Sequence, residues 1–274
     1  MTAIPLSVCI ITYNEEDNIQ GALETVKWAD DIVVIDAHST DRTVEIARAY
    51  TERVFVRDWP GFVAQKNFAM EQTRHEWVLS LDADERLSPA LQEELQRLCA
   101  TGMQADAYYI ARRAYFLGRW ITHSGWYPDY KLRLFRKSRA RWHGGEVHES
   151  VCVTGTVGYL RGDLLHYTYR DLSHNLQTID RYSTFGAQKL FAAGKRACWY
   201  DVTLRPVLTF FKKYLLCRGF QDGYPGLFIA VLTSYSNFAK YAKLWELQHR
   251  CRGTVGRQVL AEPQETSRIL PVQK

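Results

Sequence analysis

The stretch Leu6-Ser-Val-Cys-Ile-Ile-Thr-Tyr-Asn-Glu15 decides the fold, because an apolar run of strand length is followed at once by polar residues. Ile19, Ala22, Leu23 and Val26 then recur at the spacing of a helix that buries one face. The chain therefore opens with a strand-helix unit whose polar loop follows the strand.

The same pattern repeats through the first hundred residues. Further strands are predicted over residues 32–35, 54–56 and 77–81, and helices over 41–50 and around 62–72. Repeated units of this length indicate an α/β fold with a mostly parallel sheet flanked by helices. Ligands of such sheets bind at the carboxyl ends of the strands.

The pattern changes after a helix that Ser88 and Pro89 begin as N-cap and first residue. Strands or hairpins are predicted over residues 108–116, 131–135 and 155–166, and the chain is helical from about Asn175. We therefore expect an α/β domain over 1–170, a helical region over 171–252 and a poorly ordered tail over 253–274.

Charge is distributed unevenly along the 274 residues. Residues 1–100 hold 9 Lys and Arg against 18 Asp and Glu, whereas residues 101–274 hold 26 against 12. The basic half suits phosphate groups of a lipid surface, an anionic substrate or nucleic acid, unless it is ordinary solvated surface. Scattered cysteines, no apparent signal peptide and no apolar run of spanning length predict a cytoplasmic protein that does not cross a membrane.

Three carboxylates follow the predicted strand 77–81 directly, at Asp82, Asp84 and Glu85. Such groups repel one another unless a cation lies among them, and a hard divalent ion that bridges substrate phosphates is the usual solution. Asp82 and Asp84 are therefore candidate metal ligands, with a solvated acidic turn as the alternative.

Polar residues also follow the first two strands, so three strand ends should face one crevice. Tyr13 offers a ring face for a base, the backbone at Thr12 allows close approach of a nucleoside, and Glu15 and Asp36 can accept its hydrogen bonds. Helix capping is the alternative for the neighbouring Asn14 and Asp41.

The motifs around Thr12–Glu15, Asp36–Asp41, Gln65-Lys-Asn67 and Asp82-Ala-Asp84, in this order and spacing, resemble family 2 inverting glycosyltransferases of the GT-A fold. More narrowly they are similar to bacterial enzymes that add a hexose, typically glucose, to the lipopolysaccharide inner core. The resemblance covers about residues 5–150 strongly. It implies a UDP-linked nucleotide-diphosphate sugar donor, a lipid-linked saccharide acceptor and a Mg²⁺ or Mn²⁺ cofactor.

The resemblance also implies roles for single residues. Thr12, Tyr13, Glu15 and Asp36 would hold the nucleoside. Asp82 and Asp84 would contact the ribose and the metal ion, and Lys66 would lie near the nucleotide.

Inverting transfer requires a base, and the acid-poor second half must supply it. Glu149, after the strand that contains Arg133 and Arg136, is the favoured candidate, with Asp129 as the alternative and Glu146 next. The acidic pair that many family members carry there is absent. Arg133 and Arg136 are candidate diphosphate contacts, or surface arginines, and His148 is a candidate metal or phosphate contact.

The helical region holds two segments that mix apolar and basic residues, over 205–218 and 238–245. Basic amphipathic helices lie in anionic membrane interfaces, although packing on the catalytic domain would explain the same pattern. A lipid-borne acceptor favours the first interpretation. It predicts a membrane-associating C-terminal region and a peripheral location on the inner face of the plasma membrane.

Rival functions fit less well. A sugar-phosphate nucleotidyltransferase should open with a glycine-rich loop, and residues 5–20 contain no glycine. A phosphatase of the aspartyl-nucleophile type needs Thr or Val where Arg86 stands. A nucleic-acid-binding module would suffer repulsion of phosphates by the acidic cluster, so no nucleic-acid partner is expected. The sequence leaves open the alternative of a non-catalytic nucleotide-sugar-binding protein.

Overall fold

The computed structural model describes residues 3–144, 149–169 and 171–253, and these form two compact units. The first, here called the sheet unit, comprises residues 3–114, 128–144 and 149–167. The second, the helical unit, comprises residues 115–127, 168–169 and 171–253. The loop 115–127 thus groups with the C-terminal helices, although it lies inside the predicted first domain.

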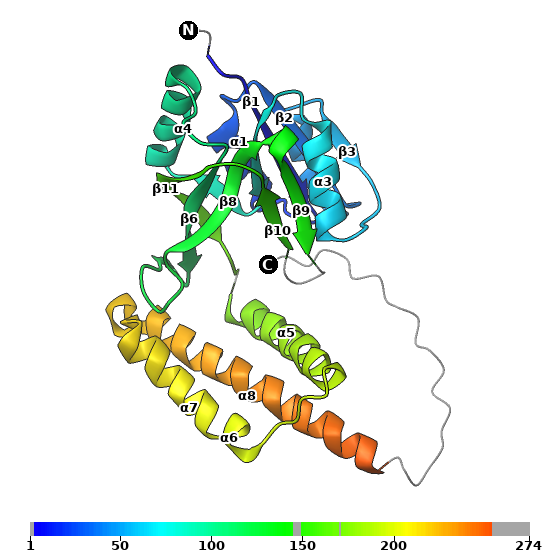
Figure 1. The fold of residues 1–274 in the computed structure, drawn as a ribbon, viewed down its shortest axis with the longest axis vertical. Coiled ribbons are helices and arrows are strands. Elements are labelled where there is room, and N and C mark those ends of the chain that lie inside the picture. The colour runs from blue at the N-terminus through cyan, green and yellow to red at the C-terminus, as the bar shows by residue number, and fades with distance from the viewer. Residues whose placement is uncertain (1–2, 145–148, 170, 254–274) are drawn as a thin grey trace. The chain divides into compact units, whose positions relative to one another are not determined.

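Among the described residues, the main sheet has nine strands in the order β3-β2-β1-β4-β8-β6-β11-β5, with β7 paired to β6 (Figure 1). The strands are β1 (Leu6–Thr12), β2 (Asp31–Asp36), β3 (Val54–Val56), β4 (Trp77–Asp82), β5 (Glu85–Leu87), β6 (Ala107–Phe116), β7 (Arg119–Trp120), β8 (Asp129–Arg136) and β11 (Val157–Tyr167). A separate hairpin pairs β9 (Ala140–Gly144) with β10 (Glu149–Val153).

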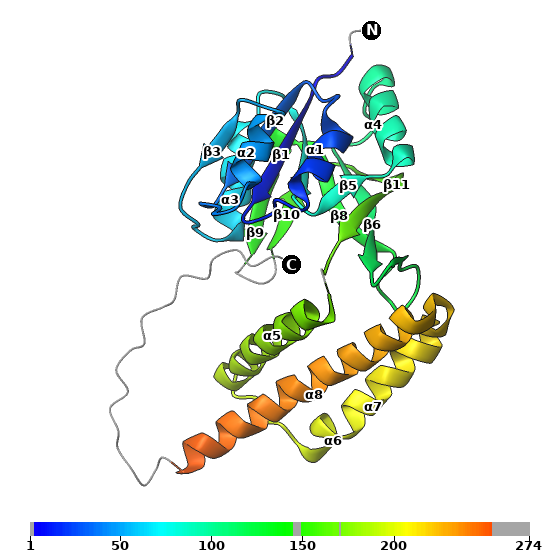
Figure 2. The same cartoon turned by 180° about the vertical axis from the view of Figure 1, so that it is seen from behind.

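Helices cover both faces of the sheet (Figures 1 and 2). One core lies under α1 (Ile19–Val26), α2 (Thr43–Arg48) and α4 (Pro89–Thr101), and the other under α3 (Phe62–Gln72) and the β9–β10 hairpin. Helix α4 begins as predicted, because Ser88 accepts a hydrogen bond from the Leu91 amide at 3.2 Å and proline occupies the first turn.

Strands β3, β2, β1 and β4 pair in parallel, whereas β4 pairs antiparallel with β8, β8 with β6 and β5 with β11. The α/β fold with flanking helices and a helical C-terminal region is confirmed. The register places Thr12 opposite Asp36 and Ile11 opposite Asp82, so the predicted strand ends do share one edge.

The helical unit is built on α8 (Gly223–Gly253), with α5 (Leu172–Ala192) and α7 (Leu204–Phe211) packed against it. Short elements complete it: α6 (Trp199–Val202), the π-helical turn η2 (Lys212–Leu216) and the 3-10 turn η3 (Gly219–Asp222). None of the helices in the described part of the chain has the length and apolar character to span a bilayer. The predicted disordered tail falls almost wholly on residues 254–274, which lie outside the described residues.

Candidate active site

Hydrogen bonds join the loops that follow β1 and β2 into one rim. The Asn14 amide donates to Ser39 Oγ at 2.8 Å, and Asn14 Oδ1 accepts from the Thr40 amide at 2.8 Å. Asn14 has a positive φ of 52°, which Asn tolerates better than most residues, and it does not cap a helix. The polar residues of the first motif therefore hold the rim in shape.

A cavity of about 570 Å³ opens beside this rim. Its lining comprises Tyr13, Ala37, His38, Arg57, Asp58, Trp59 and Pro60. Two aromatic rings, one cation and the backbone after β2 suit a planar, polar ligand such as a nucleobase with its ribose.

The other predicted nucleoside residues lie behind this lining. Asp36 is fully buried, and its carboxylate accepts hydrogen bonds from the Ser39 amide at 2.8 Å and the Ser39 hydroxyl at 2.5 Å. Thr12 is buried, and its hydroxyl has no hydrogen-bond partner among the described residues. Glu15 is buried and accepts from the Asn18 amide group at 2.8 Å. Asp36 thus positions the rim rather than lining the cavity.

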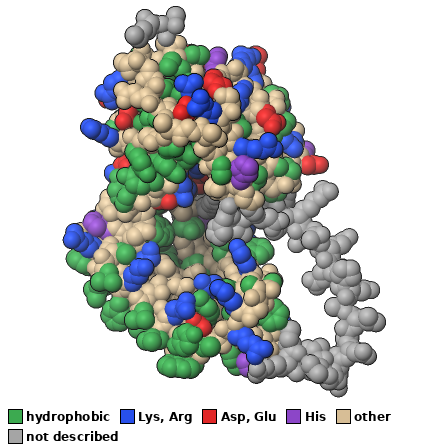
Figure 3. Space-filling view, viewed as in Figure 1, with side chains coloured by type: hydrophobic (Ala, Val, Ile, Leu, Met, Phe, Trp, Pro, Cys, Tyr) green, Lys and Arg blue, Asp and Glu red, His purple; other side chains and the backbone are tan. Residues whose placement is uncertain are grey.

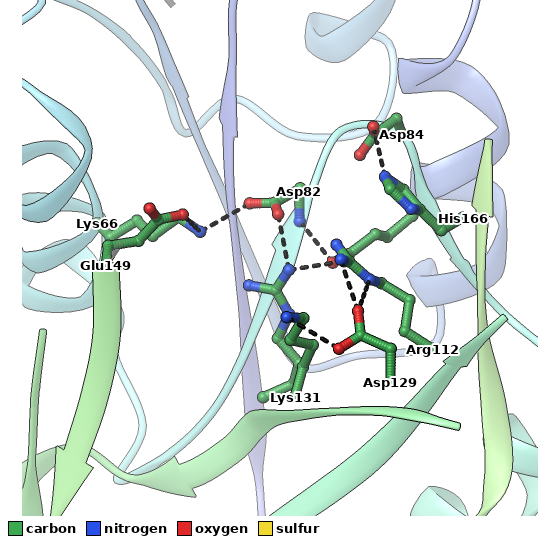
Figure 4. A network of polar contacts seen from close by, with 10 residues as sticks. Lys66, Asp82, Asp84, Arg112, Asp129, Lys131, Glu149 and His166 are labelled. Atoms are coloured by element: carbon green, nitrogen blue, oxygen red, sulfur yellow. Dashed lines mark hydrogen bonds and ion pairs between the residues drawn. The ribbon is translucent and has the colours of Figure 1, made fainter. Parts of the chain in front are cut away.

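Asp82 ends β4 between two cations (Figure 4). Lys66 Nζ lies 2.9 Å from Asp82 Oδ1, and the Arg133 guanidinium lies 2.6 Å from Asp82 Oδ2. Both cations are almost completely buried, at 2% and 4% side-chain exposure. Buried charges require an opposite charge nearby. Lys66 and Arg133 therefore depend on the Asp82 carboxylate for their positions in the site.

Glu85 holds the residues of the cluster together. Its side chain is fully buried, and its carboxylate accepts hydrogen bonds from Arg133 at 2.6 Å, from Arg112 at 3.3 Å and from the Asp82 backbone amide at 3.0 Å. Burial alone would lower the pKa of Arg133, but Asp82 and Glu85 outweigh it and raise that pKa. Arg133 is therefore a permanent cation at the end of β4.

Glu149 reaches the same cluster from the first residue of β10. Its carboxylate lies 3.5 Å from Lys66 Nζ, which also lies 4.6 Å from the centre of the Trp142 ring on β9. The hairpin thus brings Glu149 to a cation shared with Asp82 (Figure 4).

Asp129, the alternative base, lies in a different environment. Arg112 donates to it at 2.8 and 3.1 Å, and Lys131 lies at 3.1 Å. Burial acts to raise the pKa of Asp129, but Arg112 and Lys131 outweigh it and the pKa is lowered. A lowered pKa weakens a proton acceptor, so the surroundings of Asp129 disfavour it as the base.

Asp84 points to a separate partner, His166 at the end of β11. Asp84 Oδ2 lies 2.9 Å from His166 Nε2, and both side chains are buried. The described residues contain no group of three or more His, Cys, Asp or Glu side chains that could hold a metal ion. A nucleotide-bound Mg²⁺ needs only one or two protein ligands, because phosphate oxygens and water supply the others. Asp84 with His166 fits this requirement, whereas Asp82 is engaged by two cations.

The structure does not bring Arg136, a predicted diphosphate contact, to this site. Arg136 lies opposite Trp77, at the amino end of β4, and pairs with Asp106 at 3.3 Å. The strand separates it from Asp82 by five residues, about 16 Å at 3.3 Å per residue. His148 and the reserve candidate Glu146 lie outside the described residues.

The structure adds Arg112 and His166 to the site, and it assigns a contact role to Glu85, which the sequence pattern places only in the acidic cluster. His166 pairs in register with Glu85 across β11 and β5, and Arg112 with Asp129 across β6 and β8. Arg112 and His166 stand in segments predicted as strands, whereas Glu85 begins strand β5, which was not predicted. The missing signal was the antiparallel register between distant segments.

Known proteins place this chain in a class. The Glycosyl transferase family 2 model matches residues 7–167. The lipopolysaccharide core biosynthesis glycosyltransferase LpsC of Rhizobium meliloti is 31% identical over 250 residues, covering 89% of this chain and 93% of that protein. An uncharacterized glycosyltransferase of Rickettsia typhi is 32% identical over 91% of this chain and 90% of its own length.

Among solved structures, S. aureus TarS 1-349 in complex with UDP-GlcNAc is 15% identical, covers 91% of this chain and 92% of that one, and has a TM-score of 0.46. The family match and the relatives establish the class. This chain is a glycosyltransferase and belongs to family 2.

Proposed function

We propose that this enzyme transfers a hexose, glucose by preference, from a UDP-linked donor to a lipid-borne saccharide of the lipopolysaccharide inner core, with inversion. The observation that carries the proposal is the buried cluster in which Lys66 and Arg133 flank Asp82, beside the cavity lined by Tyr13. A relative named for lipopolysaccharide core biosynthesis supports the acceptor class. Family membership favours sugar transfer over the nucleotidyltransferase and sensor alternatives.

The cavity beside the β1 and β2 loops would take the nucleoside. Tyr13 and Trp59 offer ring faces, and Arg57 offers a charge to the ribose or phosphate side.

Asp84 and His166 would hold a Mg²⁺ or Mn²⁺ ion, which supplies charge stabilisation to the departing diphosphate. Lys66 of α3 and Arg133 of β8 flank Asp82 at the end of β4 and add fixed positive charge there. Glu149, held against Lys66, would accept the proton of the attacking hydroxyl. A lipid-borne acceptor places the reaction at an anionic membrane surface, on the cytoplasmic side of the inner membrane.

A panel of nucleotide sugars tests this proposal directly. Incubation with Mn²⁺ and a truncated core acceptor should release UDP fastest from UDP-glucose, and EDTA should stop release until Mn²⁺ is restored. Faster release of UDP or another nucleotide from a different sugar nucleotide would identify that compound as the donor instead. Turnover that persists in EDTA would contradict the metal requirement.

Asp36→Ala is expected to raise the donor KM about tenfold, because the Ser39 segment of the rim loses two hydrogen bonds to a charged group. The kcat at saturating donor should change much less, since Asp36 does not touch the cluster around Asp82. Titration of UDP binding, with Ser39→Ala as a milder partner variant, measures the effect. Unchanged UDP affinity in Asp36→Ala would remove Asp36 from donor binding.

A further inference from the structure

Helix α7 packs on α8 with its polar side. Three hydrogen bonds join the two helices, from Ser234 Oγ to the Pro206 carbonyl at 2.7 Å, from Asn237 to Thr209 Oγ1 at 3.0 Å and from Arg205 to the Tyr241 hydroxyl at 2.9 Å. A helix of a soluble protein normally turns its apolar side to its neighbour. In α7 the apolar residues lie on the side away from α8.

Those apolar residues form one stripe on the opposite side of α7. Its members recur at helical spacing and are exposed by 48–57%: Leu204, Val207, Leu208, Phe211 and Leu215. At 100° per residue they centre on the side of the helix away from Arg205, Pro206 and Thr209. Leu216, which ends η2, is 80% exposed. Packing within the helical unit therefore does not account for this amphipathic segment.

Charge around the stripe is positive. Residues 171–250 hold 11 Lys and Arg against 5 Asp and Glu. All five acids have partners within the helical unit. Asp180 pairs with Lys243, Asp201 with Arg205 and Glu246 with Arg250, while Asp171 caps α5 and Asp222 holds the Thr122–His123 backbone. Lys212 and Arg218, at the end of the stripe, are exposed.

The surface in Figure 3 has the same character, because hydrophobic and basic side chains share the face of the helical unit drawn there. Trp199 and Tyr200 of α6, which precede the stripe, are also exposed. Amphipathic aromatic rings of this kind favour the headgroup level of a bilayer. A second copy of the chain would oppose like charge to like charge, whereas anionic lipid complements it.

We propose that α7 and η2 lie in the plane of an anionic membrane, with the stripe from Leu204 to Leu216 among the acyl chains and Lys212, Lys213 and Arg218 at the phosphates. The inference deepens the proposed function, since it rests on a lipid-borne acceptor for its biological purpose. Its physical content is independent of catalysis, because the stripe contains no residue of the cluster around Asp82.

Co-sedimentation of the full chain with vesicles tests the proposal. The protein should bind phosphatidylcholine vesicles that contain phosphatidylglycerol, and Leu208→Ser with Phe211→Ser should weaken binding at least about tenfold, since two half-exposed side chains lose their burial in lipid. Lys212→Gln with Lys213→Gln should weaken binding to these vesicles by about fivefold per lysine. Added salt should weaken wild-type binding, because charge attraction is screened beyond about 10 Å at 0.1 M salt.

Val157→Ser is the matched control, because Val157 is an exposed apolar residue of the sheet unit and should not affect binding. UDP affinity and melting temperature of every variant should stay at the wild-type values. Equal binding to neutral and anionic vesicles, or by the stripe variant and the wild type, overturns the proposal. Self-association in the absence of lipid that the stripe variant abolishes would identify a second copy as the occupant instead. Failure of all sugar nucleotides to turn over would overturn the proposed function and leave the vesicle result standing.

Discussion

Asp84→Ala is expected to lower kcat by about a thousandfold or more, because the ion on the diphosphate loses its carboxylate ligand and several kcal/mol of charge stabilisation. Release of UDP at saturating donor measures the loss. The fold should persist, since among the described residues the Asp84 carboxylate has His166 alone as a hydrogen-bond partner. A buried imidazole left without this partner costs about 1–3 kcal/mol, which a melting curve will detect.

His166→Ala separates a metal role from a structural one. A ligand role predicts that this variant needs more Mn²⁺ for half-maximal activity and recovers part of its activity when Mn²⁺ is raised, whereas a packing defect would not respond to the ion. Asp106→Ala is the matched control, because Asp106 pairs with Arg136 and Arg139 outside the cluster and its loss should leave kcat unchanged. Near-wild-type turnover by folded Asp84→Ala protein would remove the metal assignment.

The strand-helix half of the fold was predictable because its signals are local. The four apolar residues predicted for the first helix are the buried face of α1, and β3 has the predicted bounds. Parallel strands also share a direction, so their carboxyl ends must meet at one edge. This rule alone placed Thr12, Asp36 and Asp82 together, and the register confirms it.

The antiparallel half was not predictable to the same depth, because its site residues depend on register between distant strands. Arg133 and Arg136 illustrate the difference. Strand β8 runs antiparallel to β4, so Arg133 faces Asp82 while Arg136 falls beside Trp77. No local pattern states the direction of a strand, and both arginines therefore looked equivalent. The pairing of His166 with Glu85 depends in the same way on two segments about eighty residues apart.

The helical unit shows a third limit of sequence patterns. The amphipathic sequence pattern predicts that one side of α7 is apolar, but it does not show whether that side faces the protein or its surroundings. The hydrogen bonds of Pro206 and Thr209 to α8 show which side of α7 makes the contact within the helical unit.

Glu149→Gln is expected to lower kcat by at least about a hundredfold while UDP binding stays nearly intact, since a general base contributes about 10²- to 10⁴-fold. Glutamine keeps the shape but cannot accept the proton. Lys66 would retain its 2.9 Å contact with Asp82, so the substitution leaves no unpaired buried cation. Single-turnover kinetics at saturating donor and acceptor measure the chemical step.

The comparison with Asp129→Asn gives this prediction its force, because the two carboxylates differ in their surroundings. Arg112 and Lys131 hold the pKa of Asp129 below its usual range, so it is a poor proton acceptor, and its amide variant should cost less than about tenfold. Arg112 would keep Glu85 as a partner at 3.3 Å, so the fold should survive. The opposite ranking would assign the base to Asp129. If neither variant loses more than about tenfold, a third carboxylate must take the proton, and Glu146→Gln is then the variant to measure.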